Sequence, residues 1–267
     1  MLKLWPSRPE TRKKSVSGGR SLAEQAIIEN GDYRDNFHET EEFLIEFAPS
    51  DKSGDPDFRR EFFALAEELK ALEHPGLLRL YSFGVDGDRL YRAWARRRLS
   101  AASSHRTGSF NEKCRALAQV VEGFQLLRDL EVAIELYSPQ LISHDPNQGL
   151  FLARFPFTRE SEPGQHKYHP FYLNFASIPD PVAISPETLF LVRLGLFMGV
   201  YFINEVPFAE PPLVSHWKGV PVVRKELPLP EPVGGMVERL TQLEPGKNYP
   251  DLGTGLEHAK NALLAAL

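Results

Sequence analysis

Side chains that could do chemistry are densest in the middle of the chain, where His144, Asp145 and Asn147 stand close together. A histidine, a carboxylate and an amide at this spacing could supply a general acid or base and oxygen ligands for a metal ion. Pro146 and Gly149 interrupt the same stretch, and Asp-Pro-Asn before a glycine is typical of a turn between two strands. We therefore expect a hairpin here and not a catalytic loop.

The other sequence patterns that we considered do not indicate catalysis or metal binding. His166 and His169 could bind a metal ion, but no third ligand stands near them, so we expect loop histidines. Ser/His/Asp hydrolase signatures, the phosphate-binding GxxxxGK[ST] loop and the HExxH pattern are absent from the sequence. Cys114 is the only cysteine, which excludes an internal disulfide and a cysteine-based zinc cluster.

Composition and charge place the chain among ordinary globular proteins. Of its 267 residues, 42% are hydrophobic and 25% are charged. The net charge of −5 and the pI near 5.9 argue against a nucleic-acid binder. No run of 18 uncharged apolar residues exists, the N-terminus lacks the apolar run of a signal peptide, and one cysteine fits a reducing compartment. We expect a cytoplasmic protein that binds neither membrane nor nucleic acid.

The first half of the chain is strand-rich around one helix. Phe43–Phe47 is an apolar run that ends at turn-forming residues, which predicts a strand. Residues 57–72 place apolar side chains at steps of three and four, which predicts a helix that ends before Pro75. Residues 77–83 and 89–95 predict a hairpin around a central Asp-Gly-Asp.

The second half is mainly helical. Residues 116–130 have one apolar side, and residues 189–203 are apolar nearly all round, as in a helix buried on every side. Amphipathic helices are expected at 233–243 and 256–267, and a strand is expected at 150–155.

This order of elements, together with three local stretches, resembles the protein kinase fold over roughly residues 21–267. Residues 61–84 are similar to the kinase αC helix, its His-Pro end and the following strand. Residues 127–155 match in spacing the helix, catalytic loop, hairpin and metal-binding strand of kinases. Ser185-Pro186-Glu187, with Arg193-Leu194-Gly195 after it, looks like the end of the activation segment and the central helix.

The resemblance implies an α+β fold of two lobes, a small antiparallel sheet lobe with one helix and a larger, mainly helical lobe. We expect a basic flexible tail at 1–20, the small lobe at 21–99 and the large lobe at 100–267. In kinases, the glutamate that matches Glu187 pairs with an arginine near the end of the fold. The matching stretch here offers only Lys247.

The residues that carry out phosphoryl transfer in kinases are replaced in the small lobe. A kinase needs a lysine in its third strand to bind phosphates and an αC glutamate to hold that lysine. The matching positions here are Glu46 and Leu65, and a carboxylate at the first of them is expected to repel phosphate. The phosphate loop, at best residues 29–33, has one glycine and two acids.

The large lobe departs from the kinase pattern as well. The His-Arg-Asp triplet matches Ile134, Glu135 and Leu136, and the metal-binding asparagine matches Leu141. Leucine neither accepts a proton nor binds Mg²⁺. Arg154 stands where a metal-binding aspartate is expected, so its fixed positive charge would oppose a cation there. The resemblance therefore implies no catalytic residue, no cofactor and no metal.

Two basic segments stand out against the acidic remainder. Residues 1–20 carry six basic residues against one acid, and Arg92, Arg96, Arg97 and Arg98 cluster near the expected lobe connection. Both are ordinary for solvated surfaces, and both could attract an acidic protein partner. The arginine cluster is our candidate partner-binding site.

The leading functional hypothesis is an inactive kinase-like protein, a pseudokinase, that serves as a protein-binding scaffold or regulatory module. One alternative is an enzyme of the same fold with rerouted nucleotide chemistry, and another is a nucleotide-binding sensor. A rerouted enzyme would still need a set of metal-binding Asp and Asn residues, and none is visible in register.

Overall fold

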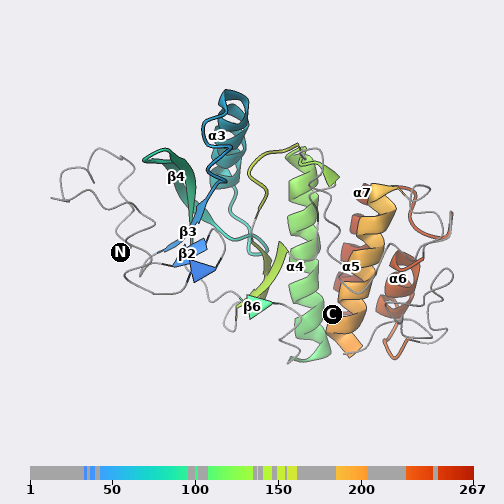
Figure 1. Cartoon of the computed structure of the whole chain (residues 1–267). Helices are drawn as coiled ribbons and strands as arrows, with labels where there is room; N and C mark the ends of the chain where they lie inside the picture. The colour runs from blue at the N-terminus through green and yellow to red at the C-terminus, as the bar shows by residue number, and fades with distance from the viewer. Residues whose placement is uncertain are drawn as a thin grey trace, which may run out of the picture. The chain divides into compact units, whose positions relative to one another are not determined.

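The computed structural model describes residues 33–34, 37–39, 43–95, 100–101, 108–134, 137, 141–145, 149–153, 155–160, 185–203, 227–242 and 246–267. The chain divides into two compact units. The first takes the chain up to Arg98 together with Pro156–Arg159, and the second takes Leu99–Phe155 and Glu160–Leu267. Figure 1 shows the elements of both units in their chain colours.

The first unit is built on a five-stranded antiparallel sheet in the order β1-β2-β3-β5-β4. Its strands are β1 (Tyr33–Arg34), β2 (Phe37–Glu39), β3 (Phe43–Phe47), β4 (Leu80–Asp86) and β5 (Arg89–Ala95). Gly87, with φ at +66°, closes the turn between β4 and β5, where a side chain would be strained. The central strands β3 and β5 are buried along their whole described length except at Arg89.

Helix α3 (Pro56–Ala71) lies between β3 and β4 in the chain and packs on one face of this sheet. It begins where Asp55 accepts hydrogen bonds from the amides of Asp57 and Phe58, at 2.9 and 3.3 Å, and proline occupies the first turn. Its buried side is made of Phe62, Leu65, Ala66 and Leu69. This apolar side packs α3 against the sheet.

The second unit combines a three-stranded sheet with helices. Strands β6 (Ser100–Ala101), β7 (Ile142–Asp145) and β8 (Gly149–Leu152) pair in that order, and the helices are α4 (Phe110–Asp129), α5 (Pro186–Ile203), α6 (Val233–Leu240) and α7 (Leu252–Ala265). Helix α4 starts with a capping box. Glu112 N donates to Ser109 Oγ at 3.3 Å, and Ser109 N donates to Glu112 Oε2 at 2.7 Å, which lowers the pKa of Glu112.

Helix α5 is the central helix of this unit. By length and composition it is apolar enough to cross a membrane, but 67% of its most apolar window is buried inside the structure, as in a core helix. Small residues let its neighbours approach closely. A Cβ on Gly195 would lie 2.7 Å from Leu240 Cβ, and a Cβ on Gly255 of α7 would lie 2.7 Å from Leu191 Cδ2.

The expected elements are largely confirmed. The helix expected at 57–72, the hairpin around the Asp-Gly-Asp turn and the buried helix at 189–203 all form, with ends shifted by a few residues. Helix α4 begins at Phe110 and not at residue 116, because the capping box extends it toward the N-terminus. The expected tail at 1–20 lies outside the described residues.

Replacing Gly195 with alanine tests the close packing of α5 on α6. Alanine favours an isolated helix by about 1 kcal/mol over glycine, but the added methyl group meets the rigid Cβ of Leu240, and overpacking costs about 1–3 kcal/mol. We expect a net loss of about 1 kcal/mol in the free energy of unfolding, measured by urea denaturation. Gly54→Ala is the matched control, since a Cβ there meets nothing within 4 Å. Equal stability of Gly195→Ala and the wild type would contradict this packing.

Candidate functional site

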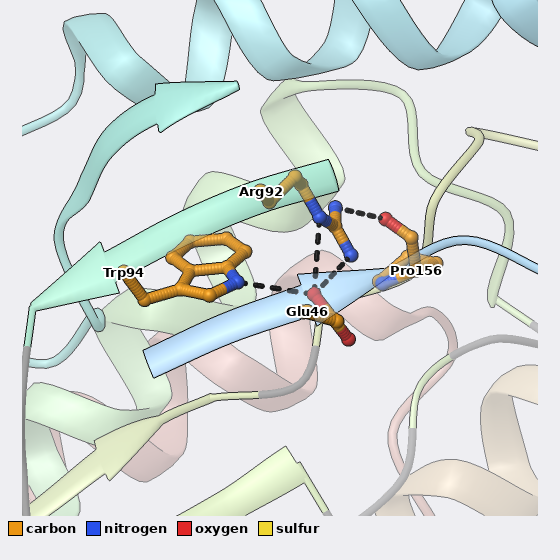
Figure 2. Close-up of polar contacts among 4 residues, drawn as sticks. All are labelled: Glu46, Arg92, Trp94 and Pro156. Carbon is orange, nitrogen blue, oxygen red and sulfur yellow. Dashed lines mark hydrogen bonds and ion pairs between the residues drawn. The ribbon is translucent and has the colours of Figure 1, made fainter. Parts of the chain in front are cut away.

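Glu46 of β3 lies directly opposite Arg92 of β5 in the register of the two strands. Arg92 donates to Glu46 Oε2 twice, from Nη2 at 2.8 Å and from Nε at 3.1 Å. Trp94 Nε1 donates to the same oxygen at 3.0 Å, as Figure 2 shows. The side chains of Glu46 and Arg92 are only 6% and 1% exposed, so the pair is a buried ion pair with a third hydrogen-bond donor.

Arg92 also holds the segment that contains Pro156. Its remaining terminal nitrogen, Nη1, donates to the Pro156 carbonyl oxygen at 2.8 Å (Figure 2). The guanidinium carbon lies 5.0 Å from the ring centre of Trp94 and 4.3 Å from that of Phe157, both within the range of cation–π contacts. Burial lowers the pKa of Arg92, and the Glu46 carboxylate opposes that shift. Each guanidinium nitrogen therefore has a partner.

The prediction that Arg92 belongs to a partner-binding surface is wrong. Its side chain is buried and all three of its nitrogens donate within the first unit, so it cannot meet a partner at the surface. Every residue of β5 after Arg89 is buried, so neither face of this strand leaves an arginine exposed. The sequence pattern did not show that both faces of the strand are covered. Arg96, Arg97 and Arg98 lie outside the described residues.

The charge of Glu46 is also balanced in a way that the sequence did not indicate. A lone carboxylate would repel phosphate, but here a guanidinium 2.8 Å away largely cancels its charge. The obstacle to a phosphate at this position is therefore occupancy. Arg92 would have to leave a buried carboxylate before it could bind another anion.

Helix α3 offers a hydrophobic residue at the position where a kinase has its αC glutamate. Leu65 is buried among the core residues of α3. Glu61, one turn earlier, lies with Oε2 3.7 Å from Arg159 Nη1. Glu61 thus pairs with Arg159, which follows Pro156 in the chain. Glu46 of β3 pairs with Arg92 within the sheet.

The positions that match the kinase catalytic loop are apolar where they are described. Leu141 is buried and Ile134 is half-buried, whereas Leu136 and Arg154 lie outside the described residues. Between them, Tyr137 is buried against Phe124 and Phe190, with ring centres 5.8 and 5.4 Å away. Burial raises the pKa of the Tyr137 phenol. Tyr137 was not singled out in the sequence, because nothing in its local pattern marks it as a core residue.

The stretch that contains His144 forms a hairpin, as expected. His144 and Asp145 belong to β7, and Asp145 faces Gly149 of β8 across the turn. No group of three or more metal-ligating side chains occurs among the described residues. His166 and His169 lie outside them.

Glu187, at the start of α5, is tied to the beginning of α7. Its Oε2 accepts a hydrogen bond from the backbone amide of Leu252 at 3.2 Å. Asp251 caps the same helix by accepting from Thr254 N at 2.8 Å, which lowers the pKa of Asp251. A helix N-terminus therefore takes part in holding the glutamate that pairs with an arginine in kinases.

A mutant cycle at the buried ion pair tests its energetics. We expect Arg92→Met to lower the free energy of unfolding by about 3–5 kcal/mol, because it leaves the Glu46 carboxylate buried without its cation. We expect Glu46→Leu combined with Arg92→Met to recover most of that loss, since a buried pair can be replaced by apolar residues at little cost. Urea denaturation of both variants provides the measurement. A double variant no more stable than Arg92→Met would contradict the assignment.

Comparisons with known proteins support the fold. A scan against known protein families finds no match, and neither does a search of curated proteins. Among solved structures, a crystal structure of the kinase domain of PknI from Mycobacterium tuberculosis is 17% identical, with 84% of this chain and 86% of that domain covered and a TM-score of 0.50. Another crystal structure of that domain is 15% identical, with coverage of 86% and 97% and a TM-score of 0.48. At such identity the likeness concerns fold alone: the chain has a two-lobed, protein kinase-like α+β fold.

Proposed function

We propose that this chain is a catalytically inactive protein of kinase-like fold, a pseudokinase, that acts as a protein-binding scaffold or regulatory module. The observation that carries the proposal is the Glu46–Arg92 pair. A carboxylate occupies the strand position where kinases place their phosphate-binding lysine, and Arg92 beside it donates from Nε and Nη2 to that carboxylate and from Nη1 to the Pro156 carbonyl oxygen.

Four other replacements support the loss of phosphoryl transfer. Leu65 removes the helix carboxylate, and Leu141 puts a buried aliphatic side chain where a metal-binding asparagine is needed. By sequence, Leu136 replaces the catalytic base and Arg154 replaces a metal-binding aspartate. These positions serve separate steps of the reaction, so restoring any one of them would not restore the activity.

Nucleotide binding is tested by thermal unfolding of the full chain with and without ATP and Mg²⁺. A ligand present at about 100 times its dissociation constant stabilises a folded protein by about 2.7 kcal/mol. For a chain of this size that raises the melting temperature by roughly 5–10 °C. We expect no such rise, and an active kinase domain provides the positive control. A saturable upward shift would favour the sensor alternative instead.

Phosphoryl transfer is tested separately with labelled ATP, Mg²⁺ or Mn²⁺ and generic protein substrates. We expect no labelling of substrate or of the chain itself, because no described or aligned residue supplies the base or the metal ligands. A mock purification from cells that lack the chain serves as the contamination control, since label that appears there comes from another kinase. Labelling that copurifies with the chain and is absent from the mock purification would overturn the proposal.

The scaffold part of the proposal concerns an acidic protein partner. With Arg92 buried, the candidate surface is reduced to Arg96, Arg97 and Arg98, together with the basic residues of 1–20. Attraction between opposite charges acts mainly on the rate of encounter and weakens as salt screens it. The partner itself must first be isolated by affinity capture from the source cell.

We expect Arg96→Glu, Arg97→Glu and Arg98→Glu together to weaken partner binding at low salt more than at high salt. The melting temperature shows whether the fold survives the three substitutions. The matched control reverses three exposed basic residues elsewhere, Arg60, Lys70 and Arg79, and so changes the net charge equally. Affinity at two salt concentrations and the melting temperature are the measurements. Equal weakening by both triple variants would show that only net charge matters, and it would exclude this surface as the partner-binding site.

A further inference from the structure

The short segment Pro156–Arg159 belongs to the same compact unit as the sheet and α3, although it is distant from both in the sequence. Phe157 packs on α3. Its ring stacks on Phe62 with centres 6.1 Å apart and planes at 25°, and it lies 6.5 Å from the ring of Phe58. The guanidinium carbon of Arg92 also lies 4.3 Å from the ring centre of Phe157. Phe157 is therefore held between the helix and the buried ion pair.

Arg159 adds an ionic contact to the same helix. Its Nη2 donates to Glu68 Oε1, and its Nη1 lies 3.7 Å from Glu61 Oε2. Residues seven apart in a helix stand two turns apart on nearly the same side, so one arginine can reach both carboxylates. The Arg159 side chain is 18% exposed, whereas those of Glu61 and Glu68 are 36% and 48% exposed, so salt can screen this contact.

We propose that Pro156–Arg159 is a clamp that fixes α3 to the sheet. One end of the clamp is the hydrogen bond from Arg92 to the Pro156 carbonyl, and the other end is the contact of Phe157 and Arg159 with α3. In kinases an ion pair between the third strand and αC performs this linkage. Here Glu46 is paired within the sheet and Leu65 carries no charge, so the linkage runs through the clamp.

This inference goes beyond the proposed function, because it holds whether or not the chain binds nucleotide. It makes the position of α3 depend on a segment that leads directly into residues 161–184. Since part of the clamp is ionic and partly exposed, its strength falls with rising salt. Clamp release is therefore a local opening, separate from global unfolding.

Hydrogen–deuterium exchange of the full chain, read by mass spectrometry, tests the clamp in Arg159→Ala. We expect exchange in α3 and in residues 156–160 to be about two- to fivefold faster than in the wild type, which is what ion pairs of this exposure contribute. Exchange in α5 and α7 should stay unchanged. Arg60→Ala is the matched control, since it removes an exposed ion pair with Asp57 on the same helix that does not involve the clamp.

Salt provides a second measurement that does not depend on the folding of a variant. At about 1 M salt the Debye length falls to about 3 Å, so we expect faster exchange of α3 in the wild type and little further effect in Arg159→Ala. Unchanged exchange of α3 in Arg159→Ala would overturn the proposal. So would faster exchange spread equally over α3, α5 and α7, because that result indicates a loss of global stability only.

Discussion

The first unit depends on one constraint, which is that a carboxylate buried in a sheet must be neutralised where it stands. The Glu46 side chain is almost fully removed from water, and an uncompensated charge there would cost several kcal/mol. A cation at the facing position of the neighbouring strand can compensate it within the sheet. Arg92 holds that position in the register of β3 and β5. The pair therefore specifies how these two strands align.

The alternation of side chains along the strands explains why this polar group sits in an apolar surrounding. Phe43, Ile45 and Phe47 point to one face, where they form a buried cluster with Tyr91 and Ala93 of β5. Glu46, Arg92 and Trp94 point to the other. Both faces of these strands are buried, so a shift of one residue in the pairing would separate Glu46 from Arg92 and turn one of the two charges toward the apolar cluster. Apolar packing and ion pairing thus favour the same register.

The sequence predicts the elements that have a strong periodicity. It does not predict which charged residues pair across neighbouring strands. The helix α3, the β4–β5 hairpin and the helix α5 follow from patterns of three and four residues, a glycine turn and a run that is apolar except at Arg193. The site was half visible, since Glu46 stood out as an acid in an apolar strand. Its pairing with Arg92 was missed because the arginine was grouped with its sequence neighbours and not with the strand opposite. A charge within each of two apolar strands was the available clue. The docking of Phe157 joins segments far apart in the chain, and no local pattern encodes it.

The partner of Glu187 is a backbone amide, that of Leu252, and not a side chain. A side-chain partner is lost by any of many substitutions, whereas a backbone donor persists whatever residue occupies position 252, with proline as the exception because it lacks the N–H group. The contact between the start of α5 and the start of α7 is thus insulated from most point mutations on the donor side. The hydrogen bond itself excludes only proline at position 252, so the packing of the buried Leu252 side chain is what limits substitution there.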